Sequence, residues 1–111
     1  MTASAAFAAH LEDLFAPLGA IKIRKMFGGA GVYCDGLMFG LVFDDVLYLK
    51  VDEGNRADFE RERCEPFRYY RDKAERNLPY FTAPDRLFDE PDDMLGWGRK
   101  ALAAAIKAKR R

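Results

Sequence analysis

The segment from residue 24 to 52 constrains the fold most strongly, because it encodes consecutive strands joined by tight turns. Its strongest signal is Asp35-Gly36, a pair that tolerates positive φ and joins antiparallel strands in a two-residue hairpin. Apolar runs at 32–34 and 37–43 flank the pair. The second run is apolar on both faces, so we expect it near the middle of a sheet.

Alternating residues extend this pattern on both sides. Ile21 and Ile23 alternate with basic residues and predict a strand with one solvated face. After a turn at residues 44–45, residues 46–51 alternate again and predict a returning strand. The glycine-rich run 27–31 interrupts the alternation, and we interpret it as a turn.

Helical periodicity marks the two ends of the chain. An apolar stripe from Phe7 to Leu18 predicts an N-terminal helix, with Ser4 as its cap. Pro91 and the apolar positions after it predict a C-terminal helix, whose acidic start and basic end suit the helix dipole. A short third helix is expected over residues 55–63, capped by its asparagine.

Two short strands are expected between the short helix and the C-terminal helix. Pro66 opens the first, at 67–70, and a polar connection at 71–77 leads to the second, at 78–81. Proline cannot donate to a neighbouring strand, so Pro79 predicts that the second strand lies at a sheet edge. An exposed edge there would allow a homodimer to form by strand pairing.

The predicted order is a helix, three or four strands, a helix, two strands and a helix. This order defines an α+β domain in which helices flank an antiparallel sheet. We expect a single domain over residues 1–111. Lysine plus arginine and aspartate plus glutamate number 18 each, so no global basic field attracts nucleic acid. No apolar run reaches the roughly 20 residues that span a bilayer, and we expect a cytoplasmic protein with no membrane partner.

Few residues offer catalytic chemistry. The glycine run lacks the lysine and hydroxyl residue of a P-loop, and a strand follows it where an anion site needs a helix. His10, Cys34 and Cys64 do not have the spacing of a structural zinc site, and reduced thiols are the simpler interpretation. We expect no catalytic residue, metal or cofactor. An enzyme or small-ligand carrier that uses His10, Cys34 and the glycine turn is the weakest of three hypotheses.

One stretch interleaves basic and aromatic residues. Its candidate contacts to nucleic acid or a partner are Arg68, Tyr69, Arg71, Lys73 and Arg76. In such surfaces the cations contact phosphates while the rings stack on bases. The structural alternative, which we favour, is a hairpin with aromatic side chains inside and basic side chains protecting an exposed edge.

Trp97 lies between two glycines inside the predicted C-terminal helix. Each glycine costs about 1 kcal/mol relative to alanine in a helix interior, so a compensating interaction is expected. The structural interpretation is close packing of the helix on the sheet, with Trp97 as an anchor. The functional interpretation is an exposed Trp97 that acts as a hot spot for a protein partner.

The chain resembles a known family along most of its length. Its signature residues are Arg24, Met26, Phe27, Gly28, Gly29, Gly31, Tyr33, Gly36, Phe39, Gly40, Tyr48, Lys50 and Asp52. Residues 55–59, 67–69 and 78–81 and the helix around Trp97 extend the match. Together they resemble the N-terminal domain of the TfoX (Sxy) regulators of bacterial competence.

The resemblance implies an α+β fold and a regulatory role, and it supplies no catalytic residues. The signature residues are interpreted as structural. Regulators of this family carry a second, C-terminal domain, which we do not expect in this chain. Our first hypothesis is therefore a non-enzymatic regulatory or protein-interaction domain, accessory to transcription regulation, with an unidentified protein such as a transcription regulator as partner. Direct nucleic-acid binding through the basic and aromatic stretch is the alternative.

Overall fold

The computed structural model describes residues 4–26, 28–71 and 74–110, and within these ranges the side chains of every residue outside 69–76. The elements are α1 (Ala5–Phe15), the 3-10 turn η1 (Ala16–Leu18), β1 (Ile21–Met26), β2 (Gly29–Cys34), β3 (Leu37–Phe43), β4 (Val46–Lys50), α2 (Arg56–Arg61), β5 (Pro66–Arg71), β6 (Ala74–Thr82), the 3-10 turn η2 (Asp85–Asp89) and α3 (Pro91–Lys109). The α+β class and the predicted element order are confirmed.

All six strands form one antiparallel sheet in the order β1-β2-β3-β4-β6-β5. The apolar strand β3 lies in the interior of the sheet, as its composition predicts. Asp35 and Gly36 form the β2–β3 turn with φ values of 51° and 85°, the positive values that a two-residue hairpin requires. The central hairpin is therefore confirmed at residue level.

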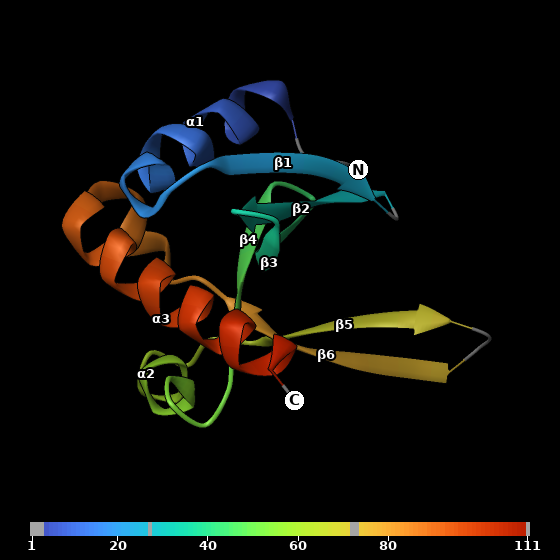
Figure 1. Ribbon diagram of the computed structural model, residues 1–111. Helices are drawn as coiled ribbons and strands as arrows, with labels where there is room; N and C mark the ends of the chain where they lie inside the picture. The colour runs from blue at the N-terminus through green and yellow to red at the C-terminus, as the bar shows by residue number, and fades with distance from the viewer. Residues whose placement is uncertain (1–3, 27, 72–73, 111) are drawn as a thin grey trace.

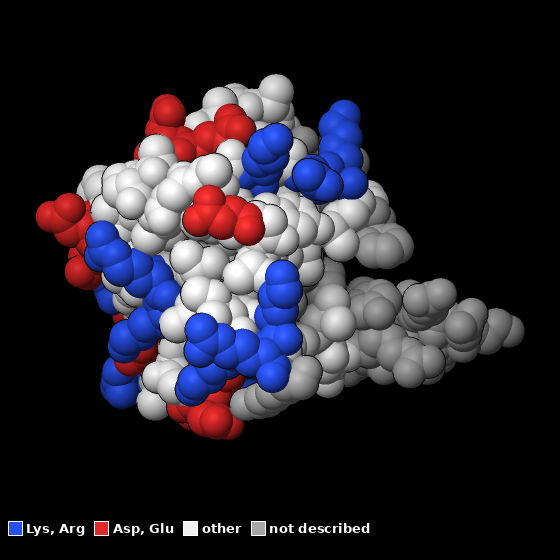
Figure 2. Space-filling view, in the orientation of Figure 1, with Lys and Arg blue, Asp and Glu red and all other residues white. Residues whose placement is uncertain are grey.

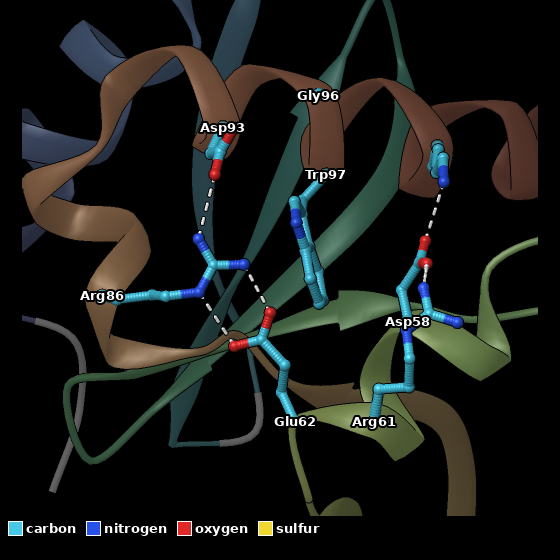
Figure 3. A pocket seen from close by; sticks show the side chains of 8 residues that line it. Asp58, Arg61, Glu62, Arg86, Asp93, Gly96 and Trp97 are labelled. Carbon is cyan, nitrogen blue, oxygen red and sulfur yellow. Dashed lines mark hydrogen bonds and ion pairs between the residues drawn. The ribbon is translucent and has the colours of Figure 1, made fainter.

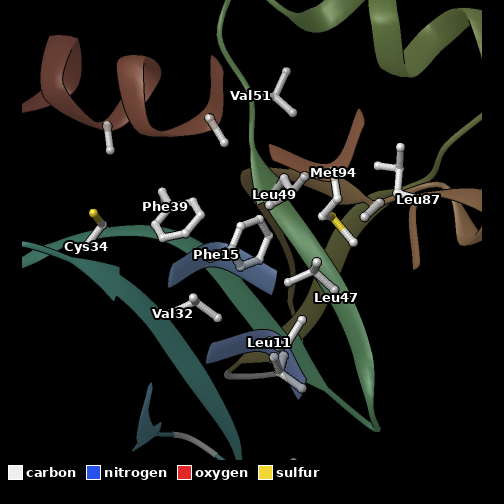
Figure 4. Packing of buried hydrophobic residues seen from close by; sticks show 14 of the residues in the cluster. Leu11, Phe15, Val32, Cys34, Phe39, Leu47, Leu49, Val51, Leu87 and Met94 are labelled. Atoms are coloured by element: carbon white, nitrogen blue, oxygen red, sulfur yellow. The ribbon is translucent and has the colours of Figure 1, made fainter. Parts of the chain in front are cut away.

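The sheet bends so that β1–β2 and β5–β6 extend in the same direction from its centre (Figure 1). Helices α1 and α3 lie on the outer side of this bend, where α3 packs on β3 and β4 and α1 packs on β1. The main core fills the space between these helices and the sheet (Figure 4). Its largest fully buried side chains are Phe15, Phe39, Phe59, Leu11, Leu47, Leu49, Leu87 and Met94.

The glycine run departs from the prediction, because most of it belongs to a strand. Among the described residues of the run, Gly28 alone has the positive φ of a turn, at 79°, while Gly29 and Gly31 lie within β2 and pair with β1. A Cβ on Gly29 would lie 2.2 Å from the carbonyl oxygen of Val42. Close backbone approach, rather than turn geometry, therefore explains Gly29.

The last strand also differs from the prediction. Residues 74–82 form one long strand, so most of the expected polar connection is strand. This strand, β6, lies between β4 and β5, and the sheet edges are β1 and β5. The prediction that 78–81 forms an edge, and with it homodimer pairing at that edge, is wrong. Pro79 is tolerated because the β4–β6 pairing begins one residue later, at Tyr80.

Local capping chemistry explains the start of α1 but not the start of α2. Ser4 Oγ accepts a hydrogen bond from the Phe7 amide at 3.1 Å, which confirms the predicted cap of α1. Asn55 precedes α2, yet its side chain does not cap it. Its Oδ1 instead accepts from the Asp52 amide at 2.8 Å, and its Nδ2 donates to the Lys50 carbonyl at 3.0 Å. Asn55 therefore holds the loop after β4, and α2 ends at Arg61, short of the predicted residue 63.

Candidate interaction surfaces

A groove of about 410 Å³ lies between α2, η2 and α3 (Figure 3). We call it the Trp97 groove, and its lining residues are Asp58, Arg61, Glu62, Arg86, Asp93, Gly96, Trp97 and Lys100. These residues come from three elements that are separated in sequence, and the sequence predicted only Trp97 among them. No local motif links the others, because the tertiary fold alone brings α2 against α3.

Arg86 is the centre of an ion-pair network at one end of the groove. Its Nε donates to Glu62 at 2.9 Å, and its Nη1 donates to Glu90 at 3.0 Å and to Asp93 at 2.9 Å. The hydrogen bond from Arg86 lowers the pKa of Glu62, and the same carboxylate raises the pKa of Arg86. Three carboxylates around one guanidinium leave this end of the groove acidic.

A second group of charges lies at the other end. Lys100 Nζ donates to Asp58 at 2.8 Å, and Arg61 also pairs with Asp58. The hydrogen bond from Lys100 is the main cause of the lowered pKa of Asp58. Acidic and basic side chains accordingly lie side by side over α2 and α3 (Figure 2). Both groups connect α2 to the segment that contains η2 and α3.

Trp97 lies between the two ion-pair groups (Figure 3). Its ring meets Phe59 edge to face at a centroid distance of 4.8 Å, and the Arg86 guanidinium carbon lies 6.0 Å from its centre. Trp97 is half-buried, so one part of the ring packs on the core and another part borders the groove. The contact with Phe59 agrees with the packing interpretation of Trp97, and the interpretation as a hot spot for a protein partner stays a prediction.

The two glycines beside Trp97 have different environments. A Cβ on Gly98 would lie 2.7 Å from Cε1 of the buried Phe15, so the approach of α3 to α1 requires this glycine. A Cβ on Gly96 would have no heavy atom within 4 Å. Packing within the described part of the chain therefore explains Gly98 and leaves Gly96 unexplained.

A second surface lies on the side of the sheet opposite the helices, the inner side of the bend in Figure 1. We call it the inner face. Leu41, Phe67 and Tyr80 form a small buried cluster there, and half-buried apolar side chains surround it. These surrounding residues are Met26, Met38, Phe43, Tyr48 and Leu78. Burial raises the pKa of Tyr80 to about 12.

Three basic side chains accompany these rings. Lys22 and Arg24 lie at alternate positions of β1, and Lys50 lies on β4. Arg24 lies over the Tyr33 ring at 5.6 Å, and Lys50 lies over the Tyr80 ring at 5.0 Å. Lys22 pairs in register with Tyr33. Lys50 is half-buried, and burial lowers its pKa. Within the described ranges no carboxylate forms an ion pair with any of the three.

The family-signature residues lie on the inner face, in the main core on the other side of the sheet, and in turns. Those that contribute to the inner face are Arg24, Met26, Gly31, Tyr33, Tyr48 and Lys50. Phe39 is in the main core, and Gly40 approaches the β4 backbone. Gly28 and Gly36 form turns, and Asp52 accepts from the Gly54 amide at 2.8 Å. Phe27 lies outside the described residues.

The basic and aromatic stretch is partly described. The favoured hairpin is present, with Arg68 opposite Asn77 and Tyr69 opposite Arg76 in the β5–β6 register. Arg68 is exposed. Lys73 lies outside the described residues, as do the side chains of Tyr69, Arg71 and Arg76. Contact of this set with nucleic acid or a partner therefore stays a prediction.

The residues of the enzyme hypothesis are not brought together in one pocket. His10 is exposed on α1 and stacks on Phe88 at 6.0 Å, whereas Cys34 is fully buried in β2. Burial raises the pKa of both Cys34 and Cys64, which disfavours reactive thiolates. The lining of the Trp97 groove includes neither His10, Cys34 or Cys64 nor a described residue of the glycine turn. Across the described ranges, no three His, Cys, Asp or Glu side chains form a metal-binding group.

Over the part of the chain that the structure describes, no helix combines the length and the apolar character that crossing a membrane requires.

An antiparallel six-stranded sheet with its helices on one face places the protein among small α+β domains. Residues 13–105 match the model of the TfoX N-terminal domain, and the chain belongs to this family. It is similar to the DNA transformation protein TfoX1 of Aliivibrio fischeri, at 31% identity over 97 residues. That match covers 84% of this chain and 46% of TfoX1, so the chain spans about half the length of this relative.

Proposed function

We propose that the chain is a non-catalytic regulatory domain of competence that binds a protein partner and acts as an accessory to transcription regulation. Membership of the TfoX N-terminal domain family supports a regulatory role, and the name of its relative supports a link to DNA transformation. The partner contact proposed here is the Trp97 groove.

The observation that carries this proposal is Gly96. A glycine in a helix interior costs about 1 kcal/mol relative to alanine, and no neighbour within 4 Å requires it. Gly96 borders a groove in which a tryptophan is half-exposed. A bare helix surface beside a tryptophan is suited to close approach by another backbone, and tryptophan is enriched among interface hot spots.

The test is a chimera made with the relative. The segment of A. fischeri TfoX1 that this chain matches is replaced by the whole chain, residues 1–111, and the chimera is expressed in an A. fischeri strain without TfoX1. The readout is transformation frequency, with chimera abundance checked by immunoblot. We expect transformation above the level of the deletion strain. A stable, abundant chimera that leaves transformation at the deletion level would contradict the proposal.

A matched pair of variants then tests the groove. Gly96→Leu fills the open surface beside Trp97 and replaces glycine by a strong helix former, so the helix itself is not weakened. Ala103→Leu adds a similar side chain to an exposed position of the same helix, outside the groove. We expect Gly96→Leu to reduce transformation by the chimera at least tenfold and Ala103→Leu to leave it unchanged. Equal activity of both variants would remove the groove from the proposal.

A further inference from the structure

We propose that the inner face binds single-stranded nucleic acid, with aromatic rings contacting bases and basic side chains contacting phosphates. The inference does not depend on the proposed protein contact, because the inner face and the Trp97 groove lie on opposite sides of the sheet. It also uses different residues from the hairpin set that the sequence predicts.

The rings of the inner face come from neighbouring strands. Tyr33 lies on β2, Phe43 on β3 and Tyr48 on β4, and all three are half-buried. Phe43 and Tyr48 pack on the buried cluster, where both rings meet Phe67 edge to face, and the Arg24 guanidinium lies over the Tyr33 ring. A sheet that presents fixed and partly exposed rings is a stacking platform for bases, and such stacking tolerates any base sequence.

The positive charge of the inner face favours an anionic ligand. Lys22 and Arg24 are exposed on β1, and Lys50 is half-buried on β4. Taking Lys50 partly out of water lowers its pKa, and over the described residues no carboxylate forms an ion pair with it in return. Asp52 opposes this pKa shift without forming an ion pair with Lys50, so an anionic ligand would stabilise the partly desolvated cation further. Cations beside aromatic rings match a chain of phosphates and bases.

The acidic groups nearest to this face lie at its margins. Burial raises the pKa of Tyr48, and the Asp44 and Glu65 carboxylates raise it further. Asp52 lies near Lys50 but pairs with Lys107 at 3.9 Å. A second copy of the chain would place like cations opposite each other, which disfavours a symmetric dimer through this face. The sheet is also bent inward here, a shape that suits a strand rather than a flat membrane surface (Figure 1).

The experiment measures binding of the whole chain to a fluorescein-labelled 20-nucleotide oligothymidylate by anisotropy, between 50 and 300 mM salt. We expect saturable binding whose affinity falls with salt. Lys22→Gln/Arg24→Gln should weaken binding about tenfold at 50 mM salt. It should also reduce the slope of log affinity against log salt by about 1.4, because each phosphate contact on a single strand contributes about 0.7.

Two further variants separate charge from stacking. Arg99→Gln/Lys109→Gln removes the same charge from exposed positions of α3, outside the inner face, and should change affinity less than twofold. Tyr33→Leu should weaken binding about fivefold and leave the salt slope unchanged, because stacking releases no counterions. Circular dichroism confirms that each variant is folded.

Three results of the anisotropy experiment would overturn the inference. They are an unchanged anisotropy at 50 mM salt, an equal loss of affinity in the two double variants, and competition by polyglutamate that is as effective as competition by unlabelled oligothymidylate. Binding to phosphatidylglycerol vesicles that the oligonucleotide fails to displace would instead assign the face to a membrane and also overturn it. Transformation by the TfoX1 chimera tests the protein contact separately, so either proposal can fail while the other stands.

Discussion

Substituting alanine at Gly96 and at Gly98 makes the same chemical change two residues apart in α3, with opposite predicted effects. At Gly96 the new methyl group meets no heavy atom within 4 Å. At Gly98 it would lie 2.7 Å from Cε1 of Phe15 and 3.2 Å from Cδ1 of Leu18. Phe15 cannot easily move away, because it is fully buried and packs edge to face on Phe39 at 5.2 Å.

The magnitudes follow from two effects. Replacing glycine by alanine in a helix interior stabilises by about 1 kcal/mol at either position. At Gly98 overpacking of the core against Phe15 costs about 1–3 kcal/mol, which cancels or exceeds that gain. We therefore expect Gly96→Ala to raise the free energy of unfolding by about 1 kcal/mol and Gly98→Ala to lower it by about 1 kcal/mol.

The assay is urea and thermal denaturation followed by circular dichroism at 222 nm. With roughly 4 °C for each kcal/mol in a domain of this size, Gly96→Ala should melt about 8 °C above Gly98→Ala. Wild type should melt between them. A Gly98→Ala variant as stable as Gly96→Ala would refute the argument that Phe15 requires the glycine.

Three further predictions concern side chains with defined partners. Asn55→Ala removes both hydrogen bonds that hold the loop after β4, so chemical denaturation should show a loss of about 2 kcal/mol. Lys50→Met should stabilise the fold at pH 7 by about 0.5 kcal/mol, since desolvation of the charge is relieved while the weak cation–π contact is lost. The folded-state pKa of Lys50 is lowered, so this difference should shrink once the pH passes 10, and denaturation at pH 7 and 11 checks it. The folded-state pKa of Asp58 is also lowered, so its ion pairs stabilise above about pH 4 and are lost as the pH falls. Asp58→Asn should therefore cost about 0.5 kcal/mol at pH 7 and nothing near pH 2, and a pH series of melting temperatures that runs parallel to wild type would contradict this.

Local chemistry made the central hairpin and the start of α1 predictable. Asp35-Gly36 needs no distant residue to adopt its turn, and Ser4 caps a helix three residues away. The strand errors came from residues whose role is set by distant neighbours. Gly29 is required because the Val42 carbonyl approaches it closely. Pro79 is tolerated because it lies just beyond the residues that pair with β4. Neither neighbour is visible in the local pattern.

The candidate surfaces were predictable to different degrees. Trp97 could be singled out because two glycines flank it, but the local sequence could not distinguish the glycine that packing requires from the one that it does not. The Trp97 groove depends on the contact of α2 with α3, which no spacing encodes. The inner face was hidden because its residues were interpreted as parts of separate strands, and their common face follows only from the register of the sheet.

The way in which the β5–β6 hairpin joins the sheet has a consequence for how this family can diversify. Three residue pairs, at Tyr48, Leu49 and Lys50 of β4, connect β6 to the rest of the sheet, and the Val51 amide donates to the Pro79 carbonyl at 2.8 Å just beyond them. Residues 74–77 of β6 pair with β5. Residues farther along the hairpin can therefore be inserted, deleted or exchanged without a change in the main core.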